Sequence, residues 1–239
     1  RPKKYLGQHF LKDENIASKI ASSLTFHQGY RHLLEIGPGT GVLTRYLLKH
    51  QVDTLYLIEI DDESVSHLQK NLTDSKVALH SGDFLKLGSA FFTSMPMGVI
   101  GNFPYNISSQ IFFKILENYQ QIPEIVCMVQ KEVGQRLCAD EGSKVYGILS
   151  VLLGAHYERE YLFTVPPVVF HPPPKVESSV IRFRLKENHS LPCDDKLFTR
   201  IVKQSFQNRR KTLRNALKQV NLPPDMLSDT TFNLRAEQI

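Results

Sequence analysis

A glycine-rich segment at residues 35–41, with the sequence Glu-Ile-Gly-Pro-Gly-Thr-Gly, constrains the fold of this chain more than any other feature. It joins a short apolar stretch at 32–36 to a helical pattern at 42–50. Glycines allow the backbone to turn sharply and to approach a ligand with no side chain in the way. In open α/β sheets, ligands bind at such strand ends. The alternative is a strand–helix turn with no ligand.

The alternation of strand and helix patterns continues along the chain. Short apolar strands are expected at 32–36, 54–58, 76–80, 97–100 and 124–129. Helices are expected at 13–24, 42–50, 62–72 and 108–119, with Asp13 as the first N-cap. A helix at 147–157 and strands at 161–163 and 176–185 follow; the prolines between these strands predict a rigid loop that cannot join the sheet ladder. The pattern predicts an α/β fold with a mostly parallel sheet covered on both faces.

Length and composition bound the organisation of the chain. Its 239 residues allow one large domain and a small appendage, which we place at 1–188 and 189–239, the second all-helical and truncated at its end. No apolar run approaches the ~20 residues of a membrane-spanning helix. The three cysteines lack metal-site spacing. We therefore expect a cytoplasmic monomer with no metal and no membrane partner.

Positive charge is concentrated near the two ends of the chain. Residues 1–12 contain four basic side chains and 196–224 contain eight, and neither segment contains an acid. Because the net charge is only +5, the rest of the chain is net negative. This distribution predicts a polyanionic partner. A solvated basic helix face is the alternative.

An acid precedes the glycines and indicates which ligand they hold. A dinucleotide-binding loop has the spacing GxGxxG, whereas this loop is GxGxG and follows Glu35. A pyrophosphate binds bare amides at a helix N-terminus and would be repelled by a carboxylate. The cationic amino group of S-adenosylmethionine would be attracted to it. We therefore expect Gly37, Gly39 and Gly41 to hold S-adenosylmethionine.

Two further acids follow the next strands. Glu59 comes eighteen residues after Gly41 and ends an apolar strand, so it is placed to accept hydrogen bonds from both ribose hydroxyls. Asp61 is the rival for this role; we prefer Glu59, because Asp61 is well placed to cap the next helix. Asp83 is expected to accept from the adenine amino group, with Phe84 packing on the ring, although Asp83 could equally be a turn residue.

Residues 102–105, with the sequence Asn-Phe-Pro-Tyr, follow the fourth strand and suggest chemistry on an amino group. The adenine amino nitrogen is a poor nucleophile because its lone pair is delocalised into the ring. The side-chain oxygen of Asn102 and the carbonyl of Phe103 could hold its hydrogens, while Pro104 stiffens the turn. Tyr105 offers a face on which an extruded base stacks, and Phe170 could form the opposite wall. A tight structural loop is the alternative.

These segments together resemble the KsgA family, the ribosomal RNA small-subunit adenine dimethyltransferases. The resemblance covers 7–11, 35–41, 58–61, 82–84, 102–108, 130–133, 170–179 and 209–215. The first five segments are shared with the Erm enzymes, which methylate large-subunit RNA. Residues 172–178 (Pro-Pro-Pro-Lys-Val-Glu-Ser) favour KsgA, as do 209–215, which resemble its C-terminal helix.

The resemblance implies dimethylation of two adjacent adenosines near the 3′ end of small-subunit (16S-type) RNA during subunit assembly. It places a Rossmann-like class I methyltransferase domain before the helical one. The residues it implies for the cofactor are Gln8, His9, Leu11, Glu35, Gly37, Gly39, Gly41, Glu59, Ile60, Asp83, Phe84 and Asn102. His9 departs from the pattern, which usually has Asn there. The residues expected to contact RNA phosphates from a basic helix are Lys203, Arg209, Arg210, Lys211 and Arg214.

Three other functions are compatible with parts of the pattern. A nicotinamide-dependent oxidoreductase conflicts with the GxGxG spacing and with Glu35. A non-catalytic RNA-binding assembly factor would not need the residues of the catalytic loop. A DNA adenine methyltransferase usually has an acid where this chain has Asn102.

Overall fold

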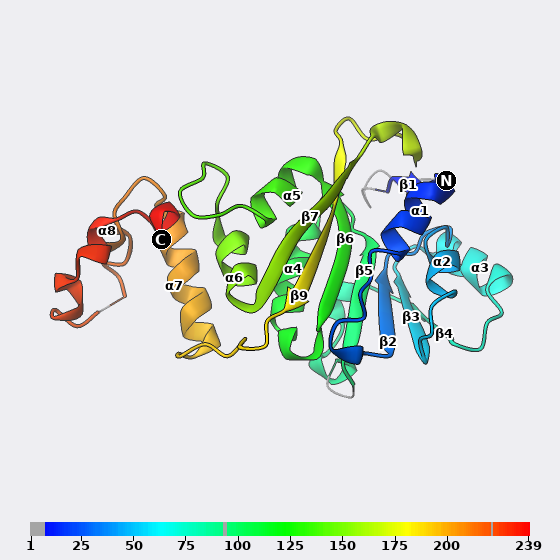
Figure 1. The fold of residues 1–239 in the computed structure, drawn as a ribbon, viewed down its shortest axis with the longest axis horizontal. Coiled ribbons are helices and arrows are strands. Elements are labelled where there is room, and N and C mark those ends of the chain that lie inside the picture. Colours follow the sequence, from blue (N-terminus) through cyan, green and yellow to red (C-terminus); the bar gives the residue numbers. More distant parts are fainter. Residues whose placement is uncertain (1–7, 93–94, 221) are drawn as a thin grey trace. The chain divides into compact units, whose positions relative to one another are not determined.

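The computed structural model describes residues 8–92, 95–220 and 222–239. A seven-stranded sheet, in the order β4-β3-β2-β5-β6-β9-β7, forms its centre (Figure 1). Five strands pair in parallel: β2 (His32–Ile36), β3 (Thr54–Glu59), β4 (Val77–Ser81), β5 (Met97–Asn102) and β6 (Glu124–Gln130). β9 (Ser178–Leu185) is antiparallel to β6, and β7 (Tyr157–Val165) lies beyond it. The predicted mostly parallel α/β sheet is confirmed.

Helices follow the strands as the sequence pattern indicates, and a further helix at 131–137 was not expected. They are α1 (Glu14–Ala21), α2 (Thr44–Leu47), α3 (Asp62–Asn71), α4 (Ser108–Leu116), α5 (Lys131–Leu137), α6 (Ile148–His156), α7 (Asp195–Gln207) and α8 (Leu213–Ala216). Asp13 caps α1 by accepting a hydrogen bond from Ile16 N at 2.9 Å, as predicted. The regular part of α2 is shorter than expected, because the amides of Lys49 and His50, which follow it, donate to the carbonyl three residues back rather than four.

Both faces of the sheet are buried. On one face, Ile20 of α1 and Leu47 of α2 share a core with strand residues such as Val180 of β9. On the other, Phe112 of α4 packs edge-on against Phe183, also of β9. Side chains alternate between faces along a strand, so residues 180 and 183 point to opposite sides. This double burial explains why β5 and β6 read as continuous apolar runs.

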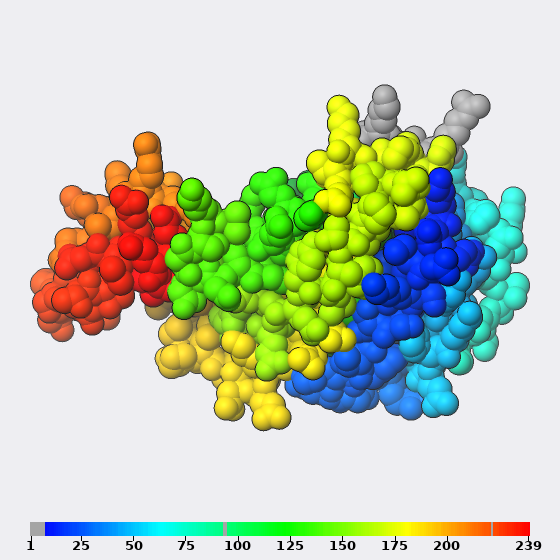
Figure 2. Space-filling model, turned by 45° about the horizontal axis from the view of Figure 1, so that its top comes forward, coloured from blue at the N-terminus to red at the C-terminus, as the bar shows by residue number. Residues whose placement is uncertain are grey.

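A second, two-stranded sheet was not expected. β1 (Phe10–Leu11) pairs antiparallel with β8 (Phe170–His171), and Lys12 N donates to Val169 O at 2.9 Å. In Figure 2 the blue N-terminal part of the chain lies against the yellow-green part to which β8 belongs. The proline-rich loop stays out of the seven-stranded sheet, as predicted. Phe170 and His171 can still pair in this smaller sheet, because they lie between the prolines and keep their amide hydrogens.

Strand β7 is also longer than the expected 161–163. It begins at Tyr157 and includes Glu158, Arg159 and Glu160. These charged residues interrupt the apolar pattern, so this part of the strand could not be recognised from the sequence. An edge strand tolerates charged side chains, because one of its sides is open to solvent.

Contacts divide the chain into two compact units, 1–134 with 158–185, and 135–157 with 186–239. The first unit holds nearly all of the large sheet and the ends of its parallel strands. The second contains α6, α7 and α8, together with 3₁₀ turns near the C-terminus. It thus takes in 135–157, which lie before the boundary we placed at 189.

Within the described ranges, none of the helices is long and apolar enough to cross a membrane. The same ranges contain no group of three or more His, Cys, Asp or Glu side chains that could hold a metal ion.

Candidate active site

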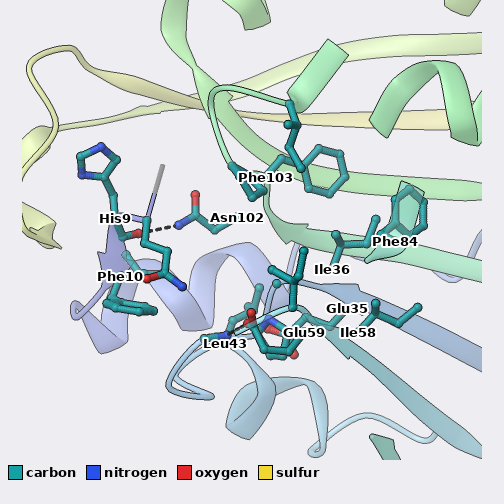
Figure 3. A pocket seen from close by; sticks show the side chains of 18 of the residues that line it. His9, Phe10, Glu35, Ile36, Leu43, Ile58, Glu59, Phe84, Asn102 and Phe103 are labelled. Carbon is teal, nitrogen blue, oxygen red and sulfur yellow. Dashed lines mark hydrogen bonds between the residues drawn. The ribbon is translucent and has the colours of Figure 1, made fainter. Parts of the chain in front are cut away.

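A cavity of about 220 Å³ opens at the carboxyl ends of β2, β3 and β5, within the first unit (Figure 3). Every residue expected to touch the cofactor lines this cavity except Gly41, and so do Phe103, Pro104 and Tyr105. Phe10, Thr40, Val42, Leu43, Leu85 and Asn106 also line it and had no assigned role. The strand ends meet there because all of these strands run parallel.

The glycine loop has the backbone that its sequence predicts. Gly37, Gly39 and Gly41 all have positive φ, at +67°, +56° and +78°. A Cβ at Gly39 would lie 2.8 Å from Cδ1 of Phe10, so this position excludes larger residues for two independent reasons. The close approach also shows that the N-terminal segment forms one wall of the cavity.

Glu35 is almost wholly buried at the start of the loop, with 1% of its surface exposed. Its carboxylate accepts a hydrogen bond from Thr44 Oγ1 at 2.7 Å. Burial raises the pKa of Glu35 to about 8; the Thr44 hydrogen bond opposes the rise, and the nearby Glu59 charge adds to it. A cation in the cavity would favour the ionised form, and the described side chains that line the cavity include no Lys or Arg.

Asp61 takes the helix-capping role that the sequence predicted, and Glu59 lies at the cavity. Glu59 lines the cavity, and its two carboxylate oxygens accept from Gly39 N and Asp61 N, each at 2.9 Å. Asp61 caps α3 by accepting from Ser64 N at 3.0 Å, which confirms the predicted cap. Burial raises the pKa of Glu59, although the backbone donors oppose the rise. Glu59 therefore ties the glycine loop to the end of β3 and remains available to a ligand.

Asp83 and Phe84 follow β4 and also line the cavity. Asp83 accepts from Leu85 N at 2.9 Å and so caps a short 3₁₀ turn, while lining the cavity. The two readings of Asp83 are thus compatible. Phe84 is buried and packs edge-on against Phe92, which holds its ring in place. Ile60 also lines the cavity and is 50% exposed, a high value for an apolar side chain.

The amide of Asn102 is oriented by the N-terminal segment. Asn102 Nδ2 donates to the carbonyl of His9 at 2.9 Å (Figure 3). A carbonyl can only accept, so the nitrogen must face His9 and Oδ1 must face away from it. Oδ1 is buried and finds no hydrogen-bond partner among the residues that the structure describes. An unpaired buried acceptor is costly, so this atom is set to receive a donor from a ligand.

Tyr105 stands beside Asn102, and its ring is fixed on two sides. Its hydroxyl lies 2.5 Å from Ser178 Oγ, and its ring centroid lies 5.4 Å from that of His9. Burial raises the pKa of Tyr105, and the hydrogen bond with Ser178 opposes the rise. Phe103 is fully buried and packs on Phe112, so its carbonyl rather than its ring is left for a ligand.

Phe170 does not take the position expected of it. Its side chain is 1% exposed and belongs to the core cluster with Leu11 and Val169, and it does not line the cavity. Burial of the apolar Phe170 ring beside β1 is more favourable in free energy than exposure of the ring to solvent in the proline-rich loop. In this structure Phe170 therefore offers no face to a base.

The basic residues of the second unit do not all lie on a helix. Lys203 is on α7, but Arg209, Arg210 and Lys211 lie in the turn before α8, so the helix expected at 209–215 is confined to 213–216. Arg209 donates to Glu237 at 2.8 Å and to the carbonyl of Lys144 at 2.6 Å. Its guanidinium is engaged within the unit, whereas Arg210 and Lys211 are exposed.

Known proteins resemble this chain over nearly its whole length. The profile of the family described as Ribosomal RNA adenine dimethylase matches residues 1–233. A ribosomal RNA small subunit methyltransferase A from Flavobacterium johnsoniae is 54% identical, over 100% of this chain and 91% of its own length. That of Cytophaga hutchinsonii is 51% identical, over 100% and 93%.

Solved structures agree. A dimethyladenosine transferase from Plasmodium falciparum has a TM-score of 0.83 and 25% identity, over 97% of this chain and 93% of that one. The 23S rRNA methyltransferase ErmE shares the fold, with a TM-score of 0.73 and 24% identity over 96% of both chains. With its Rossmann-like class I methyltransferase fold, the chain belongs to the ribosomal RNA adenine dimethylase family.

Proposed function

We propose that this protein transfers methyl groups from S-adenosylmethionine to the N6 nitrogen of two adjacent adenosines near the 3′ end of small-subunit ribosomal RNA. The observation that carries the proposal is the buried, unpaired Oδ1 of Asn102 at the rim of the cavity. It is the acceptor that an exocyclic amino group requires. The relatives named for the small subunit support the choice of RNA.

The cavity fits S-adenosylmethionine by its donor and acceptor set. Gly37 and Gly39 line the cavity without a side chain, and Phe84 and the exposed Ile60 offer apolar surface to an adenine ring. Glu35 would hold the cationic amino end and Glu59 the ribose hydroxyls. When bound, the cofactor supplies a methyl group made electrophilic by its sulfonium.

The chain's own residues prepare the amino group. In the first transfer, Asn102 Oδ1 and the carbonyl of Phe103 would accept hydrogen bonds from the two hydrogens and draw the nitrogen toward a tetrahedral geometry, which exposes the lone pair. The nitrogen–carbon bond forms as the sulfur–carbon bond of the cofactor breaks, and the methylated nitrogen then releases one proton to solvent. Tyr105 stacks on the extruded base and keeps the nitrogen in line with the methyl group. Because acceptors and geometry suffice, no side chain has to act as a nucleophile.

The direct test is methyl transfer to immature small ribosomal subunits that lack these methyl groups. We expect four methyl groups per subunit, two on each adenosine, located by mass spectrometry of the RNA. Transfer to large-subunit RNA instead, or none to either, would contradict the proposal. We further propose that the protein acts in the cytoplasm, as a monomer, on the assembling subunit rather than on free RNA.

The affinity for S-adenosylmethionine should rise between about pH 6 and pH 7. Below a pKa of about 8 the ligand-free protein keeps a proton on Glu35, and a bound cation favours the carboxylate, so binding releases that proton. The affinity should increase by nearly tenfold per pH unit in this range. Above this range, at about pH 8, the amino group of the ligand itself loses its proton. Calorimetry in buffers of different ionisation enthalpy measures both affinity and proton release. In Glu35→Gln, affinity should fall and the slope should vanish; an unchanged slope would assign the proton elsewhere.

The second unit is proposed to dock RNA through Lys203, Arg210, Lys211 and Arg214. Replacing Lys203, Arg210 and Lys211 with Gln should weaken RNA binding. It should also flatten the log–log salt dependence by roughly 0.7–0.9 per lost phosphate contact. Fluorescence anisotropy at several salt concentrations measures this slope, with cofactor affinity as the control. An unaltered slope would show that these charges form only a solvated face.

Arg209 is better excluded from that variant. Because its guanidinium bonds Glu237 and the Lys144 carbonyl, Arg209→Gln is expected to lower the stability of the second unit more than it changes the salt slope. The residues proposed to contact RNA phosphates are therefore four rather than the five expected from the sequence. The proposed RNA-binding segment still extends from α7 to α8.

A further inference from the structure

Two side chains outside the expected catalytic set hold the ring of Tyr105. Ser178 is fully buried at the start of β9, and its Oγ lies 2.5 Å from the Tyr105 hydroxyl. His9 lies across the ring at a centroid distance of 5.4 Å and a tilt of 32°. One contact fixes the end of the side chain and the other fixes its face.

Ser178 is itself firmly placed. It is paired in register with Gln130 at the end of β6. The residue before it, Glu177, accepts from Lys131 N at 2.9 Å and forms an ion pair with Lys131 Nζ at 2.7 Å. The serine hydroxyl therefore belongs to the rigid end of the sheet rather than to a free loop.

His9 is anchored from the other side. Its Nδ1 lies 2.8 Å from the carbonyl of Pro172, so this nitrogen carries a hydrogen and donates it. The next residues, Phe10 and Leu11, pair with β8, which places His9 at the end of a short ladder. The carbonyl of His9 also receives Asn102 Nδ2. His9 thus contacts two of the residues in the catalytic loop that are proposed to meet the base, Asn102 and Tyr105.

We propose that His9 and Ser178 are positioning residues that hold Tyr105 in its stacking orientation before the target base arrives. This rests on the proposed function, because it assigns Tyr105 to the base. A side chain fixed in advance loses no rotamer freedom when the base binds, so the extruded adenine is held at the attack geometry for a larger fraction of time. Loss of these contacts should therefore lower the rate of methyl transfer within the bound complex and leave the affinity for the cofactor unchanged.

A double-mutant cycle on the hydroxyl pair tests the Ser178 part. Single-turnover methylation of immature small subunits, at saturating subunit and S-adenosylmethionine, should be slowed roughly 3- to 10-fold in both Ser178→Ala and Tyr105→Phe. The double variant should be no slower than the slower single one, because both remove the same bond. Additive losses, or a wild-type rate in Ser178→Ala, would overturn this part.

Ser179→Ala is the matched control. Ser179 is the neighbouring serine, equally buried, and its hydroxyl has no hydrogen-bond partner in the described part of the chain. It points to the other face of the sheet. Its variant should methylate at the wild-type rate; a loss equal to that of Ser178→Ala would show that truncating any serine here disturbs the sheet, and would overturn the assignment. Thermal unfolding of all variants verifies folding.

Two variants of His9 test whether its aromatic ring holds Tyr105: one removes the ring and the other replaces it with a different aromatic ring. His9→Ala should slow the same single turnover roughly 3- to 10-fold, and His9→Phe should restore most of the rate by restoring an aromatic face against Tyr105. Equal rates in wild type and His9→Ala, or a loss confined to cofactor affinity by calorimetry, would refute the positioning role. An inactive wild-type protein would instead refute the proposed function, so the two failures are distinguishable.

Discussion

We expect that replacing Asn102 with alanine will lower the single-turnover rate of methyl transfer by about 100-fold or more. The side-chain oxygen of Asn102 is buried without a partner in the described structure, so it is free to accept from the target amino group. That hydrogen bond strengthens as the nitrogen gains positive charge, and a contact that is stronger in the transition state lowers the barrier itself. Rapid-quench measurements at saturating subunit and cofactor give the rate.

Two comparisons isolate this effect. In Asn102→Ala the rate should fall much more than the affinities for RNA and S-adenosylmethionine, because the amide oxygen contributes most in the transition state. Asn102→Asp keeps an acceptor but loses the donor to the His9 carbonyl and adds a charge near the sulfonium. It should also be slower than wild type. A normal single-turnover rate in Asn102→Ala would mean that the loop is structural.

We expect that replacing Glu59 with alanine will weaken S-adenosylmethionine binding by about 1–3 kcal/mol, or roughly 5- to 150-fold in Kd. The ribose hydroxyls lose a charged acceptor. The variant also leaves Gly39 N and Asp61 N without the carboxylate that now accepts from both. Calorimetry measures the affinity, and thermal unfolding reports the cost of the two unpaired amides.

Asp61→Ala is the matched variant two residues along. Asp61 caps α3, so its loss should cost about 1 kcal/mol of stability while leaving cofactor affinity close to wild type. If instead Asp61→Ala loses affinity and Glu59→Ala does not, the ribose site belongs to Asp61.

The sequence predicts those parts of the site that depend on local chain geometry. The glycine spacing anticipated the turn at 37–41, and the apolar run before Glu59 correctly separated it from the helix cap at Asp61. The position of Asn102 follows from strand β5 alone. Such features need only a few consecutive residues to specify them.

Features that join distant segments were not predictable in this way. β1 and β8 contribute two residues each, too few for any periodic signal, and their partners lie some 160 positions apart in the chain. The burial of Phe170 follows from that pairing, so its expected stacking role could not be judged beforehand. Arg209 looked like its basic neighbours, because the acid that pairs with it lies 28 residues away.

The pairing of β1 with β8 has a consequence for biosynthesis. A ribosome delivers the chain from its N-terminus, at about 5–20 residues per second, and domains generally fold as units. Residues 9–11 leave the ribosome early, but they cannot form their contacts with 170–172 until those residues have also been synthesised. In the same way, the hydrogen bond of Tyr105 cannot form before Ser178 has been synthesised. The catalytic loop of a nascent chain thus stays unassembled until β9 has left the exit tunnel. An enzyme that modifies ribosomal RNA therefore becomes competent only after its own translation is well advanced.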